Sequence, residues 1–142
     1  MPLDNRSAVV LFYESLACGR LDTVQELLDP NVEYRAAVNF IYADKNPYAG
    51  PAAVLALLRR MAAEWEHFEM ITDEIHGASD LVIACGRYLG TYKTNGYNLL
   101  AEFVHVFKFK DGKIVSQHNY TDTAQFRDAV NKEPGVNLPA GA

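Results

Sequence analysis

The sequence lacks the features that mark a nucleic-acid partner, a membrane span or a disulfide framework. Its 13 Lys and Arg residues are outnumbered by 18 Asp and Glu, and the resulting net charge of −5 argues against a phosphate-rich partner. No apolar run approaches the ~20 residues that a spanning helix needs. Cys18 and Cys85 show no CxxC spacing, and no secretory signal pattern opens the chain. We therefore expect a cytoplasmic protein with reduced thiols.

What the sequence does contain is enough apolar material for one globular domain. Hydrophobic residues make up 49% of the 142 residues, and no linker or internal repeat divides them. The expected domain covers residues 1–133. Residues 134–142 are rich in Pro, Gly and Ala, and this composition predicts a loose tail.

Apolar periodicity and turn residues predict the order of the elements. The first helix carries an apolar stripe that includes Phe12 and Tyr13, and Gly19 is a suitable stop. Later elements are expected in this order: a short helix from a capping box at Asp22 to Pro30, a strand over 31–38, a loop over 39–50, a helix over 51–67, strands over 68–76 and 81–92, a hairpin around residue 111 and a helix over 123–130. This order predicts an α+β fold in which helices pack on one face of a curved antiparallel sheet and form a cone.

The hairpin around Asp111-Gly112 places the expected site. A two-residue type I′ turn there makes Phe109 face Ile114 and His105 face His118. These positions share the more aromatic face of the sheet, because strand side chains alternate. The sequence thus predicts two histidines side by side on the inner wall of the cone.

A second turn, Asn95-Gly96, gives the same inner face. With a two-residue loop, Gly86 faces His105 and Tyr88 faces Phe103. A glycine beside His105 either leaves room for a pocket or merely permits a bend in a long strand. Both interpretations of Gly86 stay open at this point.

The polar groups near the paired histidines suggest acid–base chemistry. His105 and His118 are the candidate catalytic residues, with Asp122 or Tyr120 as partners. The alternative is that each histidine only satisfies a hydrogen bond in the core. A metal site is not expected, because Asp122 lies roughly 13 Å along the sheet from the pair. The expected ligand-binding walls are Tyr13, Tyr34, Phe40, Trp65, Phe68, Gly86, Tyr88, Phe103 and Phe107.

The opposite face of the sheet is unusually apolar at its centre. Val104, Val106 and Val115 fall there, with Ile83 and Cys85 on the neighbouring strand. An apolar patch on an open sheet face favours a partner, so we expect a homodimer through the outer sheet face.

The chain resembles the nuclear-transport-factor-like superfamily, and within it the SnoaL-like group of polyketide cyclases and ketosteroid isomerase relatives. The resemblance spans residues 9–130 and is carried by FYESLACGRLDTVQELLDPNVEY, PYAGPAAV, FVHVFKFKDGKIV and YTDTAQF. It implies an α+β cone with the ligand inside, in a protein that is often a homodimer and needs no cofactor.

At the positions of the catalytic residues of those enzymes, this chain has different residues. The first-helix tyrosine of ketosteroid isomerases falls on Phe12, their aspartate base on Tyr34 and their second aspartic acid on His105. The Glu-His-Trp-Asp stretch of related cyclases corresponds to the four residues from Gln117 to Tyr120, where Asn119 replaces the acid. The Asp-Arg-Asp set of related epoxide hydrolases has no second acid here.

Two functions of different classes follow. The first is a small cofactor-independent isomerase, cyclase or lyase acting on a cyclic or polyketide-like molecule. The second is a non-catalytic module that binds an apolar ligand in the same cone. An enzyme needs a base and a donor within reach of one ligand atom, whereas a binder needs apolar walls and an orienting group.

Overall fold

The computed structural model describes residues 3–134, so the predicted tail over 134–142 lies almost wholly outside the described residues. The elements, in chain order, are α1 (Asn5–Ala17), α2 (Leu21–Leu27), β1 (Leu28–Arg35), β2 (Tyr48–Ala49), α3 (Pro51–Glu64), β3 (Trp65–Ala78), β4 (Leu81–Tyr92), β5 (Asn98–Lys110), β6 (Lys113–Thr121) and α4 (Thr123–Asn131).

The six strands form one curved sheet in the order β2-β1-β6-β5-β4-β3. All neighbours are antiparallel except β1 and β6, which run parallel. The predicted α+β cone is confirmed, but the prediction of a purely antiparallel sheet is wrong. Strand β1 lies beside β6, so the parallel pair joins the first long strand of the chain to the last.

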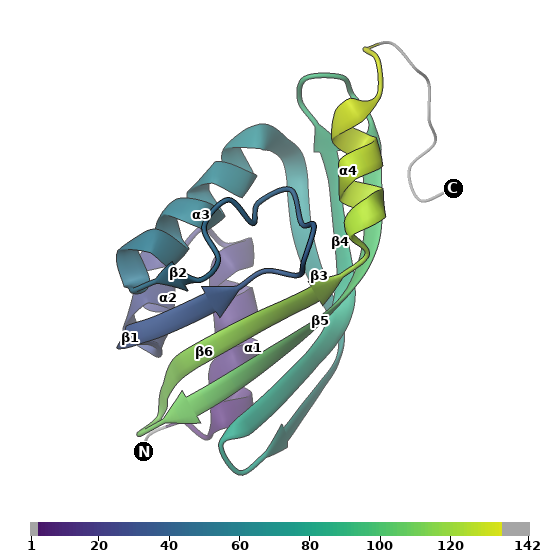
Figure 1. Ribbon diagram of the computed structural model, residues 1–142. Coiled ribbons are helices and arrows are strands. Elements are labelled where there is room, and N and C mark those ends of the chain that lie inside the picture. The colour runs from purple at the N-terminus through teal and green to yellow at the C-terminus, as the bar shows by residue number, and fades with distance from the viewer. Residues whose placement is uncertain (1–2, 135–142) are drawn as a thin grey trace.

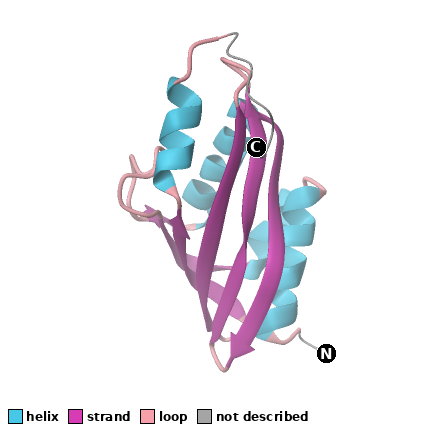
Figure 2. Ribbon diagram, turned by 90° about the vertical axis from the view of Figure 1, so that its right-hand side faces the viewer, coloured by secondary structure: helices cyan, strands magenta, loops and turns pink. Residues whose placement is uncertain are grey.

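Figure 1 shows α1, α2 and α3 against the concave side of the sheet, with α4 packed beside one end of the long strands. Figure 2 shows the long strands in front, with the described helices behind and beside them. The core lies between the helices and the concave face, which we call the inner face. Within residues 3–134, no helix combines the length and hydrophobicity that crossing a bilayer requires.

Two helix ends differ from the sequence prediction. Pro30 lies inside β1 rather than ending α2, and the expected capping box is absent because Arg20 is the N-cap residue. Helix α3 stops at Glu64, so Trp65 begins β3 instead of extending the helical stripe. In both places the strand begins directly at the end of the helix, because packing on the sheet outweighs the weaker local pattern.

The β5–β6 hairpin contains a bulge that the sequence did not reveal. Asp111 and Gly112 both have positive φ, as a type I′ turn requires, and Phe109 pairs with Ile114 as predicted. The register then shifts by one residue, so His105 pairs with Asn119 and His118 pairs with Val106. A one-residue shift moves every later side chain of β6 to the other face of the sheet. The predicted pairing of His105 with His118 is therefore wrong.

The β4–β5 connection is longer than predicted but keeps the predicted face. Strand β4 ends at Tyr92 and β5 begins at Asn98, so Gly86 pairs with Phe103 and Tyr88 with Ala101. The Asn95 side chain organises this connection: its amide donates to the carbonyl of Ala129 at 2.7 Å, which ties the turn to α4. The register of β4 against β5 differs from the predicted one by two residues. A shift by an even number keeps each side chain on its predicted face, so the inner face is unchanged.

Candidate functional site

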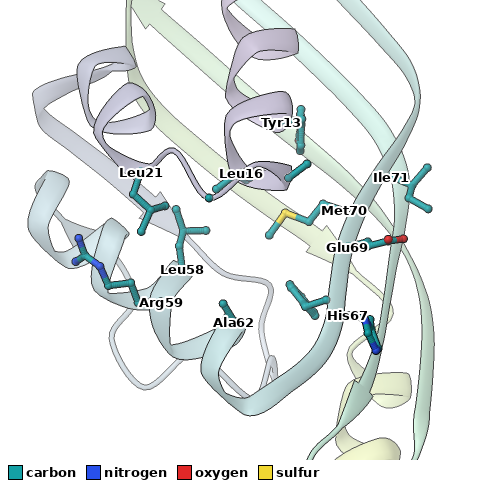
Figure 3. Close-up of a pocket in the computed structure, with 13 residues that line it drawn as sticks. Tyr13, Leu16, Leu21, Leu58, Arg59, Ala62, His67, Glu69, Met70 and Ile71 are labelled. Atoms are coloured by element: carbon teal, nitrogen blue, oxygen red, sulfur yellow. The ribbon is translucent and has the colours of Figure 1, made fainter.

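A cleft of about 630 Å³ opens between the end of α1, the middle of α3 and the first half of β3. Its walls are mainly apolar and include Leu16, Leu21, Leu58, Phe68 and Met70. In Figure 3, Met70 points into this cleft, whereas the carboxylate of Glu69 points away from it. The volume and lining are those of a site for a small hydrophobic molecule.

Tyr13 connects this cleft to a buried polar chain. Its hydroxyl oxygen lies 2.5 Å from Nδ1 of His105, and the hydroxyl of Tyr88 lies 2.7 Å from Nε2 of the same ring. Phe103 stacks on the His105 ring with the ring centroids 3.9 Å apart. Helix α1 and strands β4 and β5 thus position a Tyr13–His105–Tyr88 chain on the inner face.

Burial keeps this chain neutral. Desolvation lowers the pKa of His105 from 6.5 to about 3, and it raises the pKa of Tyr13 and of Tyr88 well above the ordinary value. A neutral imidazole has one N–H donor and one acceptor nitrogen, so one of the two tyrosines donates to His105 and the other accepts from it. The accepting tyrosine keeps its own O–H proton, which is free to be donated to another group.

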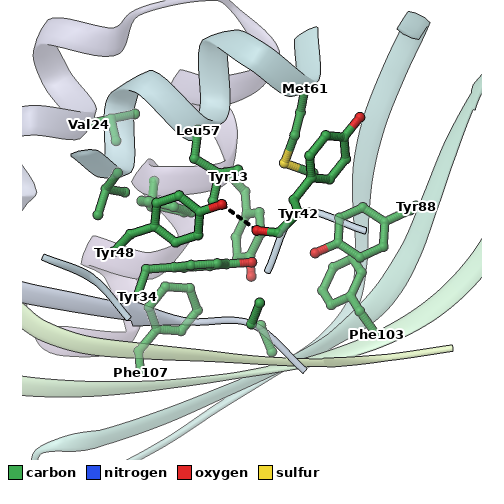
Figure 4. Packing of buried hydrophobic residues seen from close by; sticks show 14 of the residues in the cluster. Tyr13, Val24, Tyr34, Tyr42, Tyr48, Leu57, Met61, Tyr88, Phe103 and Phe107 are labelled. Carbon is green, nitrogen blue, oxygen red and sulfur yellow. Dashed lines mark hydrogen bonds between the residues drawn. The ribbon is translucent and has the colours of Figure 1, made fainter. Parts of the chain in front are cut away.

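Behind the cleft lies a much smaller void of about 10 Å³, which is the size of a single water. Tyr34, Tyr88, His105 and Gln117 line it. Figure 4 shows Tyr34 and Tyr88 pointing toward each other in the interior beneath α3. Leu58 and Met70 line both the cleft and the void, so these two side chains form the partition between them.

Asn119 lies on the inner face opposite His105, and its amide is fully buried. The amide is near enough to raise the pKa of His105 and to lower that of Tyr34, although burial is the larger effect at both. Neither amide atom has a hydrogen-bond partner with acceptable geometry among the described residues. The amide thus lies close to His105 and Tyr34 without being oriented to form a hydrogen bond with either.

Most of the expected wall residues do lie inside the cone. The following are buried there: Tyr13, Tyr34, Phe40, Trp65, Tyr88, Phe103 and Phe107. Phe68 is half-buried and lines the cleft. Their rings pack edge-to-face or stacked, as aromatic pairs prefer.

Three of the four expected catalytic residues are not brought together with His105. His118 and Tyr120 lie on the outer face, where their rings stack with centroids 4.0 Å apart. Partial burial lowers the pKa of the His118 ring, and the positive charge of Arg35 lowers it further. Asp122 is exposed at the start of α4. The bulge in β6 accounts for the position of the two aromatic residues.

Gly86 lines neither the cleft nor the void of the inner face, so it does not open the cone beside His105. A Cβ at this position would lie 2.0 Å from the backbone oxygen of Ile71 and 2.8 Å from the Phe103 ring. The neighbouring strand β3 has its own bulge between Thr72 and Glu74, which brings that backbone close. Neither of the two interpretations describes this position: Gly86 permits a close approach of two backbones.

Gln117 and Asn119 are the inner-face residues that the sequence placed on the wrong side. Polar residues occupy both the odd and the even positions of β6, since Gln117 and Asn119 alternate with His118 and Tyr120. Hydrophobic alternation therefore gave no signal for the bulge. Met70 was also missed, because β3 has no clean alternation of buried and exposed residues.

The segment over residues 36–49 covers one side of the cone and is fastened to α3. Trp65 donates its Nε1–H to the Tyr42 hydroxyl at 2.8 Å, and that hydroxyl donates to Glu64 at 2.6 Å. Tyr48 donates to the Tyr42 carbonyl, which Figure 4 marks with a dashed line. Arg60 bonds Asp44 at 2.8 Å. These contacts make the segment a fixed wall of the cone.

Arg59, His67 and Glu69 line the cleft, but the interior behind it has a different composition. No Asp, Glu, Lys or Arg is buried among residues 3–134. Within the same residues, no group of three or more His, Cys, Asp or Glu is arranged to hold a metal ion. The interior chemistry of the described chain is therefore that of neutral hydrogen-bonding groups.

The family model of the SnoaL-like domain matches residues 9–117. The chain belongs to the SnoaL-like domain family. The resemblance found in the sequence is thereby confirmed, and no curated protein is significantly similar to this chain in sequence.

Solved structures share the fold over nearly the whole chain. An NTF2-like protein from Burkholderia thailandensis has a TM-score of 0.85 at 25% identity, and the match covers 92% of this chain and 99% of that one. TerC, co-crystallised with polyporic acid, has a TM-score of 0.80 at 19% identity, with 90% and 98% covered. IdmH, a candidate polyketide cyclase from Streptomyces antibioticus, has a TM-score of 0.77 at 16% identity, with 92% and 100% covered.

Proposed function

We propose that this SnoaL-like protein binds a small, flat hydrophobic molecule of the cyclic or polyketide-like kind in the cleft and cone. The observation that carries the proposal is the cleft of about 630 Å³, which has mainly apolar walls and is also lined by Tyr13, whose hydroxyl bonds to His105. Apolar walls supply affinity, and one hydrogen-bonding group at the inner end orients the ligand. The co-crystallised polyporic acid of TerC supports the same class of ligand.

Filling the cleft tests this proposal directly. Ala62 and Ala63 of α3 are both exposed, but only Ala62 lines the cleft. Ala62→Trp should weaken binding of the apolar dye Nile red by about tenfold or more, because the indole occupies ligand space. Ala63→Trp is the matched control and should bind the dye as the wild type does. Equal binding by all three proteins would contradict the proposal.

Cofactor-free acid–base catalysis is the second candidate, and the Tyr13–His105–Tyr88 chain favours it. Such a chain can donate a hydrogen bond to a ligand oxygen on which negative charge develops. A proton-transfer enzyme also needs a base. His105 with a pKa of about 3 is a weak one. No carboxylate is buried among the described residues, and the carboxylate of Glu69, which lines the cleft, points away from it in Figure 3. Binding is therefore better supported than catalysis.

Isotope exchange separates the two candidates. An isomerase or cyclase of this kind would remove a proton from the carbon next to a carbonyl, so it would speed up deuterium exchange into bound 2-tetralone. NMR measures the rate of exchange. If the protein only binds its ligand, we expect the same exchange rate with the protein as in buffer alone. Faster exchange that His105→Gln abolishes would instead favour the catalytic function.

A further inference from the structure

Two neighbouring inward positions of β6 carry amides at the inner end of the cone. Gln117 is only 5% exposed and lines the inner void together with Tyr34 and His105. Asn119 follows on the same face and is fully buried, and neither its oxygen nor its nitrogen has a hydrogen-bond partner among residues 3–134. The Gln117 amide thus faces the void, and the Asn119 amide lies behind it, close to His105 and Tyr34.

An unpaired buried amide weakens the fold unless something else uses it. Buried polar groups almost always have partners, and an apolar side chain of the same shape would avoid the loss of hydration. Leu is close to Asn in shape and would suit the aromatic surroundings. A group that is costly to stability and placed inside a ligand cone is typical of a binding site.

The surroundings of the amides restrict the charge of what they can bind. The nearby polar groups are the neutral His105 ring and the hydroxyls of Tyr34 and Tyr88. No buried Asp, Glu, Lys or Arg among the described residues could offset a ligand charge. A charged group would lose its hydration there without gaining a counter-ion, so an uncharged group is favoured.

Each amide offers both a donor and an acceptor. The NH₂ group donates and the carbonyl oxygen accepts, so the complementary ligand group also has one of each. A carboxamide has this pattern, and so does a hydroxyl beside a ketone. A purely apolar end would leave the amides unpaired.

The ligand can reach the amides only if the partition of Leu58 and Met70 moves. The void of about 10 Å³ is too small for any group larger than water, but the cleft in front of it is large. Met70 is unbranched, half-buried and already directed into the cleft, so its side chain can change rotamer without moving the backbone. Displacement of Met70 would join the cleft and the void.

We propose that Gln117 and Asn119 determine ligand specificity: with Met70 displaced, their amides bind the uncharged donor–acceptor end of a flat ligand whose apolar body fills the cleft. This inference rests on the proposed ligand-binding function. It adds the chemical character of the ligand and the residues that select it.

Three naphthalenes of nearly equal shape test the selection. 2-Naphthamide carries the donor–acceptor group, 2-isopropenylnaphthalene replaces it by an apolar group, and 2-naphthoate replaces it by an anion. By equilibrium fluorescence titration, the wild type should bind the amide about tenfold more tightly than either of the others, as expected for a paired buried amide. Asn119→Leu and Gln117→Met should each lose most of this preference and keep their affinity for the apolar compound.

Thermal unfolding without ligand separates a binding amide from a structural one. Asn119→Leu should unfold at the same or a higher temperature than the wild type, because it removes an unpaired polar group. A lower unfolding temperature, or failure to fold, would show that the amide is structural and overturn its assigned role. Gln117→Met then tests the second amide independently.

The outcomes distinguish this inference from the proposed function. If none of the naphthalenes binds, both are overturned. If all three bind with similar affinity, or if the Leu and Met variants keep the preference for 2-naphthamide, ligand binding stands and the role of the amides is wrong. Preference lost in both variants supports the inference.

Discussion

At the scale of single residues, the interior is defined by His105, which has a hydrogen bond at each ring nitrogen and is shielded by Phe103. Protonation would turn the acceptor nitrogen of the ring into a donor, so the tyrosine that donates to it would have to accept instead. Burial makes protonation still less favourable, so the folded state holds His105 neutral across the physiological pH range. His118 differs in environment, because it lies on the outer face and is partly exposed.

We expect His105 to make the fold sensitive to mild acid. Its pKa falls from 6.5 in the unfolded chain to about 3 in the fold, so the unfolded state binds the proton more readily. The stabilisation is fully present above pH 6.5 and is lost as pH falls toward 3. Between pH 6 and pH 4, the free energy of unfolding should fall by about 1.4 kcal/mol per pH unit more in the wild type than in His105→Gln.

Urea denaturation at several pH values measures this difference. His118→Gln is the matched control, since it removes a histidine from the adjacent strand but from the outer face. It should keep nearly the full acid sensitivity of the wild type. An unchanged pH dependence in His105→Gln would show that the ring is not held neutral by the fold.

Gly86 should tolerate no side chain at all. The Cβ of alanine would lie 2.0 Å from the Ile71 carbonyl oxygen, and a backbone atom cannot move aside as a side-chain end can. Gly86→Ala should destabilise the fold by about 1–3 kcal/mol in thermal unfolding. Gly90→Ala on the same strand is the control, because its Cβ would meet mainly the Phe68 ring at 3.1 Å and should cost less.

At the scale of elements, the bulge in β6 decides which side chains form the site. The sequence predicted the type I′ turn at Asp111-Gly112 and the pairing of Phe109 with Ile114, and both are confirmed. It also predicted the α+β cone and most of its aromatic wall. The turn is set by residues that tolerate positive φ, so it can be read locally.

The residues beyond the bulge could not be read in the same way. Register depends on how a strand packs against its neighbours. The sequence of β6 gives no indication of its register, because polar residues stand at both odd and even positions. Its position is fixed by β1 on one side, where Tyr34 pairs with Gln117, and by β5 on the other. These contacts are distant in sequence, which is why His118 was predicted inside and Asn119 outside.

The segment over residues 36–49 should depend on the hydroxyl of Tyr42. This hydroxyl accepts from Trp65 and donates to Glu64, so Tyr42→Phe leaves the buried indole N–H without its partner. We expect a loss of about 1–3 kcal/mol in the free energy of unfolding by urea. Tyr120→Phe is the control, since Tyr120 is 51% exposed on the outer face. Loss of its hydroxyl should leave the free energy of unfolding nearly unchanged. Similar losses in the two variants would contradict this account.

At the scale of the whole molecule, the outer face of the sheet remains uncovered by the described helices (Figure 2). Val104 is 37% exposed, and Val106 beside it is half-buried. Along β5 these valines are flanked by exposed Glu102 at one end and exposed Lys108 at the other. A two-fold axis that passes between the valines and runs across the strands would bring each Glu102 close to a Lys108 of a second copy. With this axis the face is complementary to itself in charge.

We therefore expect a homodimer through this face. Light scattering at micromolar concentration should give twice the chain mass of 15.8 kDa. Glu102→Lys alone should weaken the dimer, because it places like charges together, and Lys108→Glu alone should do the same. The double variant with both changes restores opposite charges across the two-fold axis and should dimerise again, whereas a pairing that does not follow this axis would leave it as weak as the single variants. A wild type that remains at 15.8 kDa throughout would rule the dimer out, and the apolar centre of the sheet would then need another partner.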